Sequence, residues 1–311
     1  MEIHEAFDRL VTALENNDMK LLDDVLLRDI IIYSSHLGTI QGLAQAKAKL
    51  TWQGMPTDLA KIRVFNNVVR KAGNAARQSV YLAMLFGKEI NGFLHHLQCG
   101  FQMAAAYALH GDGWKISEIR LNMVYETGNT LLVANWWKLI DYHQFEGNNL
   151  HLIDKLAQSP WAQVPQTDTL LSEEDEVRQL FWHYNWMLDT NNIAGIYDLT
   201  TENCYPADRY SSRNDWLDTL AEKRQKEACW AHISSFETIV MKDGGARAVI
   251  YRCEPNRIGN KFLHKHNIST VYFSATWNID FIKTPQGWKM DRFGHKKGIV
   301  EQACPMTKRY F

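Results

Sequence analysis

Apolar side chains return every three or four positions in two stretches of the chain that lie far apart. The first stretch places Ile3, Phe7, Leu10 and Leu14 on one face, and the second does the same with Val177, Phe181, Tyr184 and Leu188. This spacing is typical of an amphipathic helix that buries one face. A polar turn follows each stretch, at residues 15–18 and 189–192. The pattern predicts two equivalent helices whose positions differ by 174 residues (177 − 3).

Two further phrases occur once in each half of the chain. Gly-Trp-Lys begins at Gly113 and again at Gly287, which is the same separation (287 − 113 = 174). The stretch AKIRVFNNVVRKAGNA starts at Ala60, and AHISSFETIVMKDGGA starts at Ala231, 171 residues later (231 − 60). Seven positions of these two stretches share Ala, Ile, Phe, Val, Lys, Gly and Ala without a gap. Three collinear matches at a nearly constant separation predict a tandem duplication.

Each predicted half begins with helices and continues with strands. In the first half we expect helices at residues 2–16, 19–27 and 43–52, and strands at 29–35, 60–71, 76–89, 93–110 and 114–126. Glycine or asparagine occupies the turns between the long strands, as hairpins require. Helices followed by an antiparallel meander indicate an α+β fold and not a βαβ fold. The second half repeats the order, with a short strand expected at 203–209 and a helix at 213–228.

The same pattern divides the chain into domains. At 311 residues it suits two domains, each with its own hydrophobic core. We predict a first domain over residues 1–128, a partly helical linker over 129–171 and a second domain over 172–311. Ser172 precedes several acidic residues, which is typical of the cap and first turn of a helix.

Charge and cysteine content bear on the class of function. The 34 basic and 35 acidic residues leave a net charge of −1, which offers no electrostatic footprint for nucleic acid or an anionic membrane. There is no secretory pattern and no apolar run long enough to span a bilayer. The five cysteines are scattered and odd in number, which predicts reduced thiols in a cytoplasmic protein. No motif indicates a metal, a cofactor or a covalent nucleophile.

The order of elements and the short phrases resemble the nuclear transport factor 2-like superfamily, in its SnoaL-like and scytalone dehydratase-like branch. The resemblance implies that each half is a cone, with about three helices packed on a strongly curved antiparallel sheet around a pocket. Members of this family usually dimerise by packing their sheets. The resemblance therefore implies that the two halves form a domain–domain pseudo-dimer, and it leaves any further oligomer open.

Two residues of the second half match the acid–base positions of that branch. MLDTNN places Asp189 at the aspartate that ends the first helix, with Leu188 where the family has a tyrosine. WAHISSF places His232 at a histidine that lines the pocket. A carboxylate can orient an imidazole, and an imidazole with a pKa near ~6.5 exchanges protons at neutral pH. In the alternative interpretation, Asp189 caps a turn and His232 is a hydrogen-bonded strand residue.

The resemblance also implies residues that would contact a ligand. CEPNRIG has Asn256 where the dehydratases have a second histidine. YFSATWN retains Ser274 and has Thr276 in place of an asparagine. Together with Tyr184 and Tyr205, these residues make up the candidate substrate-binding set.

The first half lacks the acid–base pair. Glu15 and Lys61 stand at the positions that match Asp189 and His232. Its remaining candidates, Tyr33, His36, His95 and His96, are interpreted as structural, because a lone histidine on an apolar strand face is more often a satisfied core residue than a ligand. We therefore expect ligand binding mainly in the second domain.

One pair of histidines has the spacing of a metal site. In FLHKHN, His264 and His266 lie two residues apart, on one face of a predicted strand. This spacing can bind a metal, but no phrase supplies a third ligand. We expect an interface or a solvent-exposed face there, and no metal.

Two functions remain in view. The first is a cofactor-independent enzyme, a lyase or an isomerase, that dehydrates, isomerises or cyclises a small apolar, aromatic or polyketide-like molecule with His232 and Asp189. The second is a non-catalytic binding or assembly module similar to the small subunits of aromatic-ring dioxygenases. A paired Asp189 and His232 favours the enzyme, and side chains that point to different sides favour the module. Fold alone does not choose between them, because one fold hosts many functions.

Overall fold

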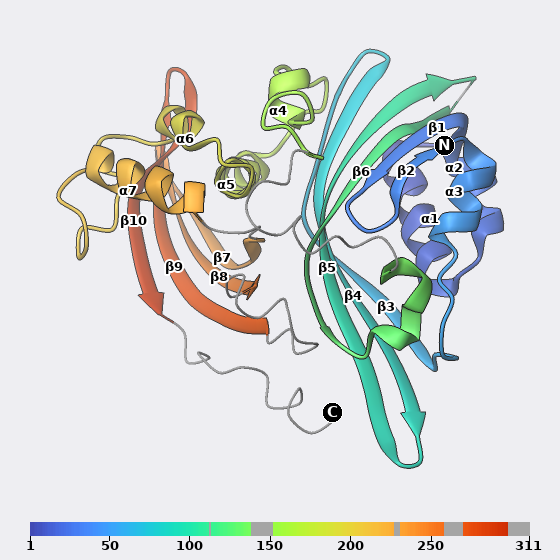
Figure 1. The fold of residues 1–311 in the computed structure, drawn as a ribbon. Helices are drawn as coiled ribbons and strands as arrows, with labels where there is room; N and C mark the ends of the chain where they lie inside the picture. The colour runs from blue at the N-terminus through green and yellow to red at the C-terminus, as the bar shows by residue number, and fades with distance from the viewer. Residues whose placement is uncertain (112, 138–151, 227–230, 258–269, 298–311) are drawn as a thin grey trace.

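The computed structural model describes residues 1–111, 113–137, 152–226, 231–257 and 270–297 of the chain. These residues form two α+β domains that lie side by side, each with helices against a curved sheet (Figure 1). The α+β class predicted from the sequence is confirmed. Among the helices of the described ranges, none is both long enough and apolar enough to cross a membrane.

The first domain places its helices before a six-stranded sheet. Its elements are α1 (Ile3–Asn16), η1 (Met19–Leu21), α2 (Leu22–Val25), β1 (Leu26–Ser34), β2 (Gly38–Gln41), α3 (Leu43–Leu50), β3 (Leu59–Ala72), β4 (Ala75–Ile90), β5 (Phe93–His110), β6 (Gly113–Gly128) and η2 (Thr130–Trp137). The strands are ordered β2-β1-β6-β5-β4-β3 across the sheet. The four long strands are the four that the alternating pattern predicted.

This sheet is mixed, which corrects the expectation of a purely antiparallel one. Strands β3 to β6 form an antiparallel meander, and β2 is antiparallel to β1, but β1 runs parallel to β6. Parallel neighbours need a crossover connection. Here α3 and four strands separate β1 from β6 along the chain, and this crossover brings them together in the same direction.

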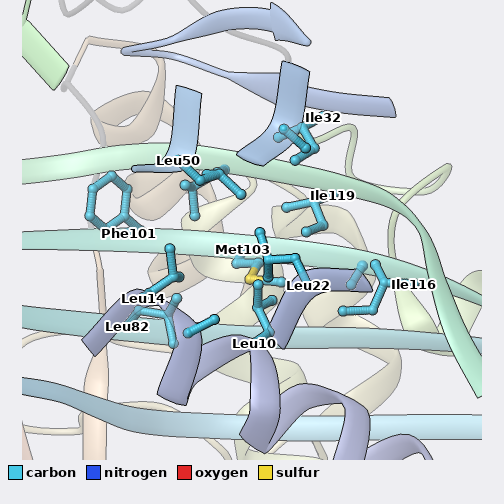
Figure 2. Close-up of a cluster of buried hydrophobic side chains, with 14 of the residues drawn as sticks. Leu10, Leu14, Leu22, Ile32, Leu50, Leu82, Phe101, Met103, Ile116 and Ile119 are labelled. Atoms are coloured by element: carbon cyan, nitrogen blue, oxygen red, sulfur yellow. The ribbon is translucent and has the colours of Figure 1, made fainter. Parts of the chain in front are cut away.

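The amphipathic face of α1 packs into the core of the first domain. Leu10 and Leu14 lie in one buried cluster with Leu82 of β4 and Met103 of β5 (Figure 2). Trp136 of η2 is buried in the same cluster. The packed first domain therefore extends into the segment that the sequence assigned to the linker.

The second domain has a four-stranded antiparallel sheet. Its elements, with a short helix that precedes it, are α4 (Pro160–Gln163), α5 (Glu173–Asp189), α6 (Ile193–Leu199), α7 (Arg213–Lys226), β7 (Ile233–Lys242), β8 (Gly245–Arg257), β9 (Thr270–Thr284) and β10 (Gly287–Lys297). The strand order is β10-β9-β8-β7. The hydroxyl oxygen of Ser172 accepts a hydrogen bond from the Asp175 main-chain N–H, as the sequence predicts for an N-cap.

The strand expected at residues 203–209 does not form. Proline lacks the N–H that a ladder requires, and the Pro206 carbonyl instead accepts hydrogen bonds from Arg209 and Tyr210 in a turn. Only an isolated parallel bridge between Thr200 and Met290 is present nearby. This bridge joins the chain to β10. It occupies the place in the second domain that the parallel pair of β1 and β6 occupies in the first domain.

The two domains share a third buried cluster. Strand β4 alternates, so Val80 and Leu82 enter the core of the first domain while Tyr81 faces the second domain. The cluster contains Tyr81, Ala104, Val124, Tyr125, Ile153, Trp186, Ala231 and Ile233. The part of the first sheet that carries Tyr81, Ala104, Val124 and Tyr125 is therefore buried on both faces, and its second face meets α5 and the start of β7.

Candidate functional site

The end of α5 and the start of β7 bring Asp189 and His232 together. One carboxylate oxygen of Asp189, Oδ2, accepts the main-chain N–H of His232 at 2.8 Å. The other, Oδ1, is in direct hydrogen-bond contact with Nδ1 of the His232 ring. The side chains are 0% and 1% exposed, respectively, so water does not compete for this contact. The carboxylate thus holds both the backbone and the ring of one histidine.

The tautomer of His232 follows from its second partner. Nη2 of Arg224, in the last turns of α7, lies 3.2 Å from Nε2 of the ring. A guanidinium has donors and no acceptor, so Nε2 must carry the lone pair. The proton is then on Nδ1 and is donated to Asp189. Sequence reasoning singled out the pair but not Arg224.

Burial decides the charge of His232. The pKa of this histidine is lowered to about 3, and burial is the largest cause; the Asp189 carboxylate acts to raise the pKa, and the positive charges of Arg252 and Arg224 act to lower it. A cationic ring would have to lie in a closed site beside two guanidinium groups. His232 is therefore neutral at physiological pH, in agreement with its hydrogen bonds.

A residue of the first domain completes the hydrogen bonds of Asp189. The phenol of Tyr81 donates to Asp189 Oδ2 at 2.6 Å. Burial raises the pKa of Tyr81 well above its ordinary value, and the charge of Asp189 raises it further. Tyr81 therefore keeps its proton and acts as a donor. Nothing in the local sequence around Tyr81 predicts this contact, because it depends on how the two domains pack.

Two buried asparagines hold the main chain at His232. Nδ2 of Asn66, in β3, donates to the His232 carbonyl at 2.7 Å, and Nδ2 of Asn185, in α5, donates to the same oxygen at 3.3 Å. Asn66 Oδ1 also accepts from the N–H and hydroxyl of Ser234, at 3.2 and 2.9 Å. Asn66 sits at a β-bulge with φ of 46°, a left-handed conformation that asparagine tolerates. The Asn-Asn pair within a strand pattern is the one sequence signal of this feature.

Aromatic side chains line the interior of the second domain beside the pair. The ring of Trp277 is roughly parallel to His232, at an interplanar angle of 28° and a centroid distance of 6.2 Å. Tyr184 contacts the same tryptophan at 6.2 Å, and the Arg252 guanidinium lies 4.8 Å from its centroid. Tyr205 packs, partly buried, against the same core. The candidate residues Tyr184 and Tyr205 therefore share a core with His232's stacking partner.

Ser274 and Thr276 do not join this group, which corrects their assignment to the ligand-binding set. In β9, Ala275 and Trp277 face the core of the second domain. Successive side chains of a strand point to opposite faces, so Ser274 and Thr276 lie on the other face of the sheet. Ser274 and Thr276 match the family phrase in order, but each lies one residue away from a position that faces the core. The side chain of Asn256 lies outside the described residues.

The first domain has an ion pair at the corresponding place. Glu15 ends α1, and its Oε1 accepts the main-chain N–H of Ile62 at 2.7 Å, while Oε2 lies 3.6 Å from Nζ of Lys61. The β3–β4 turn joins Ala72 to Ala75, and the β7–β8 turn joins Lys242 to Gly245. Counted from these turns, Ile62 rather than Lys61 corresponds to His232. In both domains a carboxylate at the end of a helix therefore accepts a main-chain N–H. Only in the second domain does that N–H belong to a histidine.

The other histidines singled out in the sequence lie in different surroundings. His36 is fully buried, with Nδ1 at 2.7 Å from the Ser34 hydroxyl, and its ring packs near Phe101 and Trp136. His95 has Nδ1 at 3.4 Å from the side-chain amide of Asn129. His264 and His266 lie outside the described residues. Within the described parts of the chain, no group of three or more His, Cys, Asp or Glu side chains is arranged to hold a metal.

Comparisons with known proteins give likeness in structure only. No protein-family model matches the chain, and no curated protein matches it in sequence. A type 2 hexachlorocyclohexane dehydrochlorinase (LinA) is 13% identical over 41% of this chain and 86% of its own, with a TM-score of 0.35. An NTF2-like protein of Cytophaga hutchinsonii is 17% identical, over 39% and 95%, with a TM-score of 0.32. A nuclear transport factor 2 (NTF2-like) superfamily protein of Salmonella enterica is 14% identical, over 38% and 84%, with a TM-score of 0.31.

Each domain of this chain shows the order of elements that the sequence resemblance implied. In each, helices come first, and a curved sheet built on an antiparallel meander follows (Figure 1).

Proposed function

We propose that this protein is a cofactor-independent enzyme in which Asp189 and His232 carry out acid–base chemistry on a small apolar or aromatic molecule. The observation that carries the proposal is the defined tautomer of His232. Nδ1–H donates a hydrogen bond to the Asp189 carboxylate, and the lone pair of Nε2 therefore points away from Asp189. An imidazole oriented in this way is a general base with a fixed direction of attack.

The reaction class follows from the groups around Nε2. When a ligand with a carbonyl enters, its oxygen replaces Nε2 as the acceptor of Arg224, and a neighbouring C–H faces Nε2. Nε2 takes that proton, the C–H electrons form the C=C bond of an enolate, and Arg224 stabilises the oxyanion. Asp189 stabilises the imidazolium. Return of the proton to another atom gives isomerisation, and expulsion of a hydroxyl, with the proton, gives dehydration.

Several features support a flat, largely apolar ligand and a site in the second domain only. The buried ring of Trp277 lies beside His232, and Tyr184 packs against Trp277, so the surroundings of the imidazole are aromatic. In the first domain, the corresponding carboxylate of Glu15 accepts the main-chain N–H of Ile62 and lies beside the Lys61 ammonium, so it has no imidazole partner there. We further propose that the two domains arose by tandem duplication and form a pseudo-dimer within one chain.

A second candidate function is a non-catalytic binding or assembly module. The observation that favours it is the burial of the pair together with its contacts to the first domain. Tyr81 and Asn66 from the first domain both bind the Asp189–His232 region. In this view the pair fastens the two domains, and a ligand or a partner chain binds elsewhere.

Hydrogen–deuterium exchange distinguishes the two functions without knowledge of the natural substrate. We would incubate the protein in D₂O with 2-tetralone, an enolisable aromatic ketone, follow deuterium incorporation by NMR, and confirm binding by quenching of tryptophan fluorescence. The enzyme hypothesis predicts catalysed exchange that falls by about 10²–10⁴-fold in His232→Gln. His36→Gln, which changes a buried histidine of the first domain, should leave exchange unchanged. A bound ketone that exchanges only at the buffer rate would favour the module.

A further inference from the structure

The hydrogen bond between Tyr81 and Asp189 joins the two domains at the candidate site. Tyr81 belongs to β4, which lies between β3 and β5 in the sheet of the first domain. It is 1% exposed, and its ring meets Trp186 of α5 edge to face, at a centroid distance of 6.3 Å and an interplanar angle of 79°. A side chain packed in this way on an inner strand has a fixed position, so its hydroxyl is a fixed donor.

The three donors to Asp189 are divided unequally between its two oxygens. Oδ2 accepts from the Tyr81 hydroxyl at 2.6 Å and from the His232 N–H at 2.8 Å. Oδ1 accepts from the ring of His232. Two donors on Oδ2 fix the rotation of the carboxylate, which leaves Oδ1 directed at the imidazole. Without the tyrosine, only one N–H would hold that orientation.

We infer that Tyr81 of the first domain is a positioning residue for the Asp189–His232 pair of the second domain. The inference rests on the proposed function of that pair, and it assigns the first domain a part in the site although its own pair is Glu15 and Lys61. Tyr81 acts through Asp189 and transfers no proton itself. Its hydrogen bond stabilises the carboxylate charge and so sets how strongly the pair attracts a proton.

The tyrosine at the equivalent strand position of the second domain does not make a matching interdomain contact. Tyr251 follows the β7–β8 turn by as many residues as Tyr81 follows the β3–β4 turn. Tyr251 is 49% exposed, and its hydroxyl is hydrogen-bonded to Glu237 of its own domain. The interdomain use of this strand position is therefore one-sided, and Tyr251→Phe is a matched control for Tyr81→Phe.

The test measures the proton affinity of the pair directly. Among the described residues, the titratable groups around the His232 ring are Asp189 and Tyr81 on one side, together with Arg224, Arg252 and Tyr184. We would label histidine with ¹⁵N and follow the Nδ1 and Nε2 resonances of His232 between pH 8 and pH 4, a range in which the wild-type ring, with its pKa lowered to about 3, stays neutral. Loss of one hydrogen bond to a charged acceptor should raise the protonation midpoint in Tyr81→Phe by about one to two pH units.

Tyr251→Phe should titrate like the wild type. A His232 titration in Tyr81→Phe that matches the wild type would overturn the inference, even if thermal stability falls, because Tyr81 would then only fasten the domains. Should Tyr81→Phe not fold, 3-fluorotyrosine at position 81 keeps the ring and strengthens the donor. It should weaken the His232–Asp189 hydrogen bond and move the Nδ1–H proton resonance upfield at pH 7, and an unmoved resonance would likewise overturn the inference.

Neither measurement needs a substrate, so this inference and the proposed function fail separately. A shifted midpoint in a protein that catalyses no exchange of bound 2-tetralone supports the positioning contact and contradicts the enzyme. Catalysed exchange with an unchanged midpoint in Tyr81→Phe supports the enzyme and contradicts the role of Tyr81.

Discussion

The side-chain amide of Asn66 donates to the main-chain carbonyl of His232 at 2.7 Å, so a residue of the first sheet holds the chain where the second sheet begins. The same asparagine accepts from the N–H and hydroxyl of Ser234. One side chain thus satisfies a main-chain carbonyl, a main-chain N–H and a hydroxyl at a buried boundary. Since buried polar groups without partners are costly, this residue should matter to both domains.

Asn66→Ala is expected to destabilise the protein by about 2–3 kcal/mol, because buried partners lose their hydrogen bonds and alanine is strained at a positive φ. Urea unfolding measures the loss. Asn191 has a similar φ of 55° but is exposed, so Asn191→Ala isolates the backbone strain and should lose only about 1 kcal/mol. Equal losses in the two variants would show that the interdomain hydrogen bonds contribute nothing.

Asp189→Asn should impair both stability and exchange. The amide keeps the shape of the carboxylate, but one of its two terminal atoms becomes a donor, so at least one of the three buried donors around it loses its acceptor. We expect a loss of about 1–3 kcal/mol in stability and a fall of about 10²–10⁴-fold in deuterium exchange of 2-tetralone. Asp198→Asn, on the exposed side of α6, is the control. Unchanged exchange in Asp189→Asn would remove the carboxylate from the reaction.

Two buried histidines, His36 and His232, and the largely buried His183 predict a specific sensitivity to acid. Burial lowers the pKa of His36, His183 and His232 to about 3 each, whereas all three titrate near ~6.5 when unfolded. Between these values the unfolded chain binds more protons, so stability is complete above pH 6.5 and is lost as the pH falls toward 3. At pH 5 each histidine should cost about 2 kcal/mol relative to pH 7.

Urea unfolding at pH 7 and pH 5 measures this loss. His36→Gln removes one of the three groups, so the difference between the two pH values should shrink by about 2 kcal/mol. Stability that does not change from pH 7 to pH 5 would mean that these rings are protonated, or reached by water, in the folded protein.

The halves of the chain should depend on each other. Separation of residues 1–171 from 172–311 would expose the apolar faces that carry Tyr81, Tyr125 and Trp186. An exposed patch of this kind promotes association, so we expect each half to be poorly soluble alone and to copurify with the other when both are expressed together. Size-exclusion chromatography of the two halves, alone and mixed, checks this. Two soluble halves that ignore one another would contradict the pseudo-dimer.

Much of each domain is decided by local sequence pattern. Strand β5 covers residues 93–110, as the alternation predicts, because a turn at Asn91 and Gly92 precedes it and Gly111 follows it, all with positive φ. Helix α1 ends at Asn16, and Asn17 adopts a left-handed conformation there. These turns and helix ends depend only on residues that are close together in the sequence. They can therefore be predicted before the fold is known.

Which strands become neighbours depends on the whole chain. The parallel pairing of β1 with β6 depends on a long crossover, and the turn at Pro206 replaces a strand that the repeat had predicted. Ser274 and Thr276 match a phrase in the right order but face away from the core, because a displacement of one residue in a strand reverses the face.

For the candidate site, the sequence alone determined that Asp189 ends a helix and that His232 lies at the beginning of a strand. Tertiary structure decided that the two meet, that Arg224 determines the tautomer of His232, and that Tyr81 and Asn66 arrive from the other domain. Periodicity reports which face of an element is buried. It carries no information about the distant side chain that packs against that face, because that choice depends on how complete sheets and helices pack together.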